Sequence, residues 1–164
     1  EALSDAFDCD YCIGKIYDSE FANIGKRSGG DGLDVSGSNL DVTGISFSDI
    51  RDKAVSVGEE SQMRLKDIKF TRVNFGLVAK DASKVEAESI TAEDVSHYAL
   101  MSYTKKPLFG SATLQALKFQ CSGCEAKIVS EMGSVLSVNG VSIASQALDV
   151  GKLYNTVMKS DKPL

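Results

Sequence analysis

Apolar and polar residues alternate along short stretches of the chain, and this alternation recurs at a regular interval. Stretches such as LDVS, LDVTGISF and MRLKDIKF carry apolar residues mostly at every second position. A period of two is typical of a β-strand with one buried face, whereas an amphipathic helix repeats every ~3.6 residues. Gly, Asn, Asp and Ser separate the stretches, which indicates turns between short strands.

The alternating stretches align as copies that start 22 or 23 residues apart. Segments that begin at Gly32, Ala54, Gly76 and Ala99 overlay one another, and the last contains a short insertion over residues 103–111. The alignment predicts, among others, five columns of stacked apolar residues: Leu33, Val55, Leu77 and Leu100; Leu40, Met63, Val85 and Ala112; Val42, Leu65, Ala87 and Leu114; Ile45, Ile68, Ile90 and Leu117; and Phe47, Phe70, Ala92 and Phe119.

One further copy lies at each end of this series. The segment from Asp5 overlays the segment from Asp31 over 17 positions without a gap. The last copy, with an Asn-Gly turn at residues 139–140, contains the apolar residues Ala126, Ile128, Leu136, Val138, Val141 and Ile143. Six copies therefore cover about 140 residues.

Three short strands in each copy of about 22 residues predict an all-β fold, a parallel β-helix or solenoid. We expect it to be right-handed, because parallel crossover connections almost always are. Adjacent coils of such a rod lie ~4.8 Å apart. We therefore assign residues 1–146 to a β-helix of about six coils.

The two ends of the predicted rod differ. At the C-terminus, residues 147–164 are predicted to form a capping helix and tail, with Asp149 as N-cap and apolar residues from Val150 to Met158 at helical spacing. At the N-terminus, residues 1–4 are too few to cover a coil. We therefore expect an open N-terminal end that packs on a preceding domain or on another copy of the chain.

Several of the repeat segments resemble a known family. The strings GGDGLDVSGS, DKAVSVGEES, KDAS and YTKKPLFG are similar to a right-handed parallel β-helix repeat domain of bacterial surface or secreted proteins, found beside spore-coat-H-like and lamin-tail domains. The resemblance covers residues 5–158 and implies the fold and a cell-surface or extracellular location. It implies no activity, although the wider pectate-lyase-like superfamily includes polysaccharide lyases, hydrolases and epimerases.

The composition excludes some function classes. The formal net charge is −5, and residues 1–60 hold 13 acidic and 5 basic residues. A nucleic-acid partner is not expected, because phosphate binding requires a basic face. No apolar stretch is long enough for a membrane span. One His and no Trp leave few side chains for histidine-based chemistry.

Acidic residues stack between the first two copies. The alignment places Asp5 over Asp31 and Asp8 over Asp34. Carboxylates on adjacent coils repel one another unless a cation or a raised pKa relieves the repulsion. These four residues are therefore candidate calcium ligands, because Ca²⁺ takes six to eight oxygen ligands. The alternatives are a solvated acidic face and a pair of catalytic carboxylates of a glycoside hydrolase.

A second candidate site follows the polar edge of the repeats. It is a groove for a polysaccharide, in which Tyr103 stacks on sugar rings and Lys105 and Lys106 contact anionic groups. The predicted binding residues are Lys53, Glu59, Lys80, Asp81, Tyr103, Lys105 and Lys106. Opposite charges in these positions are equally consistent with coil-to-coil ion pairs, and a lysine here is also a candidate base of a calcium-dependent lyase.

Four cysteines form two CxxC pairs, Cys9 with Cys12 and Cys121 with Cys124. Four coils separate the pairs, about 20 Å along the rod, whereas zinc–sulfur bonds measure ~2.3 Å. A shared zinc site within one chain is therefore excluded. Two local disulfides, free thiols and an intermolecular link remain open.

The sequence thus predicts the fold more firmly than the function. We expect a non-catalytic β-helix module of a bacterial surface or secreted protein, with a rigid structural role or a glycan-binding, adhesive role. The alternative is a polysaccharide-active enzyme, a lyase, hydrolase or epimerase, with calcium as its cofactor.

Overall fold

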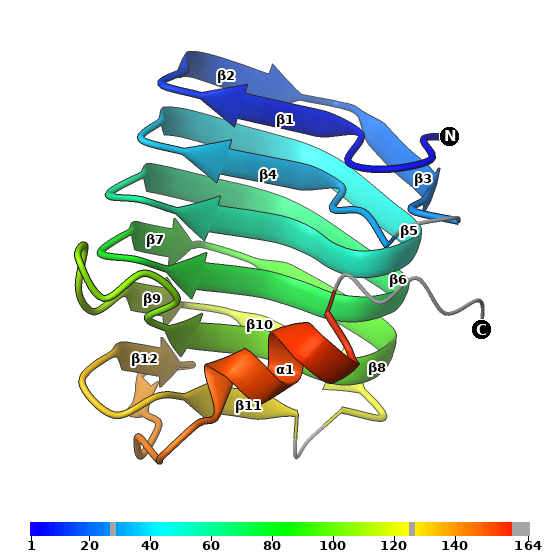
Figure 1. Ribbon diagram of the computed structural model, residues 1–164. Coiled ribbons are helices and arrows are strands. Elements are labelled where there is room, and N and C mark those ends of the chain that lie inside the picture. The colour runs from blue at the N-terminus through cyan, green and yellow to red at the C-terminus, as the bar shows by residue number, and fades with distance from the viewer. Residues whose placement is uncertain (27–28, 125–126, 159–164) are drawn as a thin grey trace.

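The computed structural model describes residues 1–26, 29–124 and 127–158. Parallel strands stack into a right-handed β-solenoid of about six coils. In Figure 1 the chain runs along the front of the molecule, returns behind it and descends by one coil at each circuit. This confirms the predicted fold class. Ala126 and residues 159–164, which the sequence assigns to the last coil and to the tail, lie outside the described residues.

The strands of the coils form three parallel faces, which we call A, B and C. Face A is formed by the following elements in order: β1 (Phe7–Asp10), β4 (Leu33–Ser36), the last parts of β5 (Asn39–Gly58), β6 (Gln62–Lys80) and β8 (Ile90–Tyr103), and β11 (Ile128–Ser130). β5 and β6 run without interruption through all three faces, so neighbouring faces are joined by bends rather than by loops.

Faces B and C complete the coil. Face B consists of β2 (Ile13–Tyr17), the first parts of β5 and β6, β7 (Lys84–Ala87), β9 (Thr113–Ala116) and β12 (Val135–Val138). Face C consists of β3 (Glu20–Ile24), the middle parts of β5 and β6, the first part of β8, and β10 (Phe119–Ser122). At the C-terminal end, β13 (Val141–Ser142) turns back antiparallel to β12.

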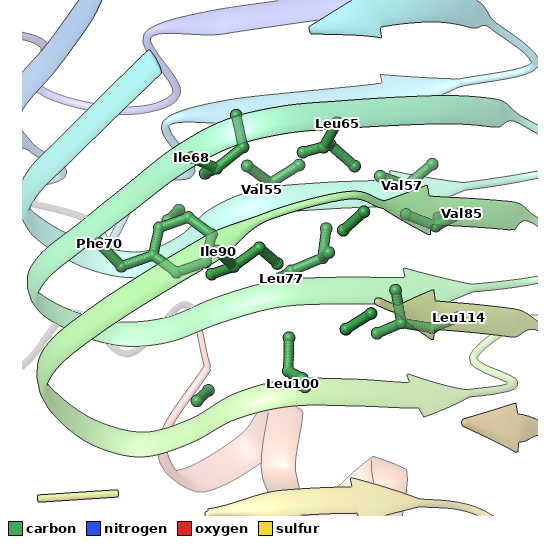
Figure 2. Close-up of a cluster of buried hydrophobic side chains, with 14 of the residues drawn as sticks. Val55, Val57, Leu65, Ile68, Phe70, Leu77, Val85, Ile90, Leu100 and Leu114 are labelled. Atoms are coloured by element: carbon green, nitrogen blue, oxygen red, sulfur yellow. The ribbon is translucent and has the colours of Figure 1, made fainter. Parts of the chain in front are cut away.

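Inward side chains stack in columns and fill the rod, as Figure 2 shows for the central coils. Leu33, Val55, Leu77 and Leu100 form one column, and each of these side chains is 0% exposed. Phe21, Phe47 and Phe70 stack on face C with ring centroids 5.1 and 5.7 Å apart. Between the end coils, each such side chain is covered by its copies above and below, which is why the apolar pattern repeats from coil to coil.

The fifth coil differs from the prediction by two residues. Leu114, not Ala112, pairs with Val85, and Phe119, not Leu117, pairs with Ile90. The same shift moves Ala116 and Cys121 into the columns predicted for Leu114 and Phe119, as their pairs with Ala87 and Ala92 show. A shift of two preserves the inward and outward alternation of a strand, so the hydrophobic pattern alone does not fix the register.

The first coil has no coil packed on its outer edge within the described residues. Its inward residues Phe7 and Ile16 are half-buried, whereas Leu33 and Val42 beneath them are at most 1% exposed. Ile13 is 88% exposed. This end of the described rod is therefore open, as expected from the sequence.

Helix α1 (Val150–Thr156) begins at the predicted N-cap, Asp149, whose side chain accepts a hydrogen bond from the Lys152 amide. It lies across the outside of face A, in front of the last coils (Figure 1). Under it, the outward residues Val78, Met101 and Val129 form an apolar stripe that is at most 1% exposed. Face A is therefore buried on both sides where the helix covers it.

Candidate functional site

The residues predicted for a polysaccharide groove lie on the outer side of face A and at its edge. Outward positions there change from polar to apolar along the rod. Asp34 and Ser56 occupy one column in the second and third coils, and Val78 continues this column in the fourth coil. The polar side chains therefore adjoin the apolar stripe that α1 covers.

Lys53 is the centre of a buried charged cluster. Its Nζ donates hydrogen bonds to Asp52 Oδ2 at 2.7 Å and to both carboxylate oxygens of Asp31, at 3.1 and 3.3 Å. The side chains of all three residues are 0% exposed. The Lys53 backbone amide also donates to Asp31 Oδ1 at 2.9 Å. Lys53 is thus bonded to a carboxylate of the preceding coil and to its own neighbour in the chain.

Burial and charge shift the pKa values in this cluster in opposite ways. Burial raises the pKa of Asp31 to about 6, although the Lys53 ammonium acts against that rise. Burial lowers the pKa of Lys53, but the carboxylates of Asp31 and Asp52 outweigh it and raise that pKa above its usual value. The lysine therefore stays charged, and the aspartate is mainly ionised at physiological pH but takes up a proton at a higher pH than an exposed aspartate does.

Tyr103 is not an exposed stacking platform. Its side chain is 0% exposed, and its hydroxyl lies 2.9 Å from the hydroxyl of Tyr154 on α1. The Tyr154 ring has the Nζ of Lys105 at 4.5 Å and that of Lys53 at 5.7 Å from its centroid, which are cation–π contacts. Burial raises the pKa of Tyr103 well above its usual value. The expectation of an open aromatic groove is therefore corrected, because α1 covers this tyrosine.

Lys80 is also buried, and its ammonium lies 3.5 Å from Asp34 Oδ1 in the second coil. The Lys80 side chain reaches the Asp34 carboxylate by passing over Gly58, which belongs to the coil between these two residues. A Cβ at position 58 would lie 2.7 Å from Lys80 Cε. Glycine at this position therefore leaves room for a lysine that joins two coils.

The remaining predicted residues hold the loop between β8 and β9. Asp81 is buried, and its Oδ1 accepts hydrogen bonds from the backbone amides of Lys105 and Lys106 at 2.7 and 2.6 Å. The Lys106 side chain pairs with Glu59. The described contacts of the seven predicted residues are thus made within the protein: to one another, to the backbone, to Asp31, Asp34 and Asp52, and to Tyr154 of α1.

The four aspartates predicted for calcium do not converge on one point. Asp5 Oδ1 accepts a hydrogen bond from the Asp31 amide at 2.7 Å, while the Asp31 carboxylate bonds to Lys53. Asp34 lies near Lys80, and Asp8 is exposed. In the described part of the chain, no group of three or more His, Cys, Asp or Glu residues is arranged to hold a metal ion.

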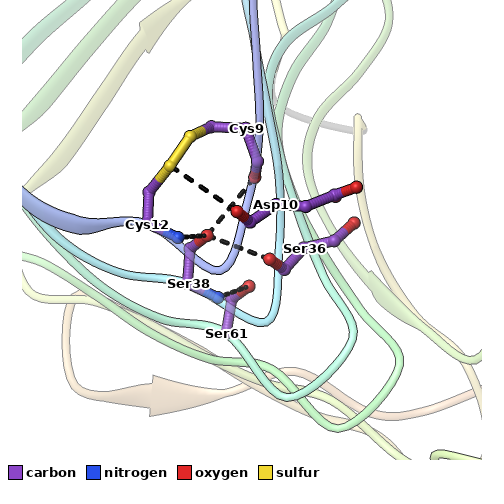
Figure 3. The surroundings of a disulfide bond; sticks show 6 residues. All are labelled: Cys9, Asp10, Cys12, Ser36, Ser38 and Ser61. Atoms are coloured by element: carbon purple, nitrogen blue, oxygen red, sulfur yellow. Dashed lines mark hydrogen bonds between the residues drawn. A yellow bond between two sulfur atoms is a disulfide. The ribbon is translucent and has the colours of Figure 1, made fainter.

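Both CxxC pairs are local disulfides, one near each end of the rod. Cys9 and Cys12 join the end of β1 to the start of β2, with Cα atoms 6.1 Å apart. As Figure 3 shows, the Cys12 amide donates to Ser38 Oγ, and the Ser38 amide donates to Ser61 Oγ in the next coil. Cys12 therefore lies at the N-terminal end of a column of hydrogen-bonded serines, Ser38 and Ser61. Cys121 and Cys124 close the turn after β10.

Two contributors to this region, Asp52 and Tyr154, were not predicted. The cover over face A has a signal in the sequence, because Leu77-Val78, Leu100-Met101 and Ile128-Val129 replace alternation with adjacent apolar pairs. Such pairs indicate a strand that is buried on both faces. The adjacent apolar pairs therefore indicate that another element covers the outside of face A. They do not indicate that Tyr154 is part of that cover.

The outer side of face B is open. Polar residues on successive strands, Asn39, Gln62, Lys84 and Thr113, form one column. Beside them, Arg64, Glu86 and Gln115 help to line a shallow hollow of about 380 Å³. This surface presents accessible polar side chains from several coils.

Comparison of the chain with known protein families, with curated proteins and with solved structures gives no match. In the described residues, no helix has both the length and the apolar character to cross a membrane. The fold and the contacts of the chain itself therefore carry the functional argument.

Proposed function

We propose that this chain is a non-catalytic structural module, a rigid spacer of a bacterial surface or secreted protein. One observation carries the proposal: charged side chains pair from one coil to the next. Asp31 with Lys53, Asp41 with Arg64 and Asp49 with Arg72 are 22 or 23 residues apart in sequence. Carboxylate and basic side chains of the kind that a catalytic site needs are thereby engaged in ion pairs that hold adjacent coils in register.

The two disulfides support a location outside the cytoplasm. Disulfides persist in secreted and surface proteins and are rare where thioredoxin and glutathione keep thiols reduced. Here each bond closes a turn near one end of the rod, where the stacking is interrupted. The resemblance of the repeat strings to the β-helix repeat domain of bacterial surface proteins supports the same location.

A second role, glycan binding, is favoured by face B. Its hollow of about 380 Å³ is lined by amide, hydroxyl and charged side chains from four strands. Flat arrays of such groups at the ~4.8 Å coil spacing are suited to hydrogen-bond the hydroxyl groups of an extended sugar chain. In this role the module binds polysaccharide without changing it.

An activity screen tests the proposal against the enzyme alternative. The chain is incubated with acidic and neutral polysaccharides, with and without calcium, and assayed for new reducing ends and unsaturated products. We expect no product and no calcium-dependent change in the melting temperature. Calcium-dependent product that is lost in the variant Asp8→Asn with Asp34→Asn would overturn the non-catalytic assignment and restore the predicted calcium site.

Glycan binding has its own test. The variant Arg64→Ala with Glu86→Ala removes two side chains of the face B hollow, and Lys69→Ala with Thr91→Ala on face C is the matched control. We expect retention on immobilised acidic or neutral polysaccharide to fall for the face B variant alone. Equal retention of both variants would exclude face B as the binding surface.

A further inference from the structure

The Asp31, Asp52 and Lys53 cluster contains the groups that an intramolecular amide bond requires. A primary amine and a carboxyl group face each other across two adjacent coils, and a second carboxyl group contacts the same amine. The contacts are 3.1 and 3.3 Å from Lys53 Nζ to Asp31 and 2.7 Å to Asp52. The three side chains are 0% exposed, so no bulk water separates them.

We propose that Lys53 and Asp31 become joined by an isopeptide bond, with Asp52 as the group that transfers the proton. Lys53 Nζ forms a bond to Asp31 Cγ, and one Asp31 oxygen leaves as water. The ammonium supplies both hydrogens of that water, and the amide nitrogen keeps the third. Charge balances, because one ammonium and one carboxylate become a neutral amide, and no oxidant, reductant or external reagent takes part.

The surroundings favour this condensation. A buried ion pair carries the desolvation cost of two charges, and converting it to an amide removes both. The Lys53 backbone amide fixes Asp31 Oδ1 at 2.9 Å, so Oδ2 is the oxygen free to leave. The Tyr103 and Tyr154 side chains pack nearby and help to keep the site apolar.

The protonation states are consistent with a slow, single reaction. Burial raises the pKa of Asp31 to about 6, which brings the neutral carboxyl form within reach near neutral pH. The two carboxylates raise the pKa of Lys53, so the free amine is produced only as its proton moves to Asp52. The pair of Asp34 and Lys80 is longer, at 3.5 Å, and the Asp34 side chain is 17% exposed, so water reaches this pair and it is not expected to react.

Mass spectrometry of the intact, reduced chain tests this directly. We expect a mass lower than the sequence mass by one water molecule. Trypsin then yields peptide 28–51 joined to peptide 52–64, because cleavage after a modified Lys53 is blocked. These peptides separate the proposed bond from cyclisation of the N-terminal Glu1, which also removes one water.

Variants complete the test, with circular dichroism to confirm that each is folded. Lys53→Met and Asp52→Asn are expected to have their full sequence masses, and Lys80→Met is the matched control that keeps the water deficit. A folded wild-type chain with its full mass, which releases free peptide 54–64 on digestion, would overturn the proposal. The mass and the digest of the wild-type chain decide the question even if a variant does not fold. Neither outcome, bond present or bond absent, depends on the proposed role as a spacer.

Discussion

The alternation in the sequence correctly predicts which residues point into the rod, but it does not predict which outward residues are exposed to solvent. The inward positions of Leu33, Val55 and Leu77 follow from a period of two, and all three are fully buried. Lys53 and Tyr103 were expected to face solvent, yet they too are 0% exposed. Alternation tells which side of a sheet a residue occupies, but not whether another element covers that side.

Leu65 provides the residue-scale test of the core. It is 2% exposed and stacks between Val42 and Ala87, so Leu65→Asp places a charge in a central column. We expect a loss of several kcal/mol, enough to unfold a domain of ordinary stability. Circular dichroism and urea titration measure the effect. Gln62→Asp, on the exposed side of the same strand, is the control, and an unchanged melt of Leu65→Asp would reject the register.

His97 gives a pH prediction. Its ring stacks on Phe75 with centroids 5.0 Å apart, and burial together with the Lys127 ammonium lowers its pKa. The unfolded chain therefore takes up this proton first as pH falls through the unfolded value of ~6.5, and stability decreases. Urea unfolding at about pH 7.5 and about pH 5 is expected to show a smaller loss for His97→Gln than for the wild type. Equal losses would contradict the lowered pKa.

At the scale of elements, the strands were predictable and the fifth-coil register was not. The 22- and 23-residue spacing identifies most columns because each coil is nearly the same length. The insertion between Tyr103 and Thr113 removes that constraint, and a slip of two residues keeps every inward position apolar. Leu117, placed in the core by the shorter alignment, is 41% exposed in the turn before β10.

The cover over face A is testable through methionine oxidation. Met101 is 0% exposed beneath the C-terminal segment, whereas Met132 is 66% exposed. Leu153→Asp on α1 is expected to loosen the helix and to speed oxidation of Met101 by peroxide, with Met132 as the internal control. Peptide mass spectrometry follows both rates. An unchanged oxidation rate of Met101 in a folded variant would show that α1 does not shield face A from solvent.

The disulfides are expected to act locally. Each closes a loop of only four residues, for which the chain-entropy argument gives about 2 kcal/mol. Cys9→Ser with Cys12→Ser is therefore expected to fray the first coil while the central coils stay folded. Limited proteolysis detects this as cleavage confined to the N-terminal region. Cleavage spread over all coils would show instead that the bond supports the whole rod.

At the scale of the molecule, the six coils act as one stack. Apolar columns run through the rod, and ion pairs such as Asp41 with Arg64 join neighbouring coils at its surface. Exposed pairs of this kind contribute little each, so most of the stability comes from the columns. The sequence predicted this architecture, but it did not reveal that the candidate binding residues of face A form contacts between coils and with α1.

Hydrogen exchange of the native chain, followed residue by residue, tests that central claim most directly. If face A is a structural surface, amides of β5 on face A, including that of Lys53, exchange as slowly as those of the same strand on faces B and C, through global unfolding alone. Rapid exchange confined to face A, with faces B and C protected, would mean that this face opens independently. That result would contradict the structural account and identify face A as a gated binding surface.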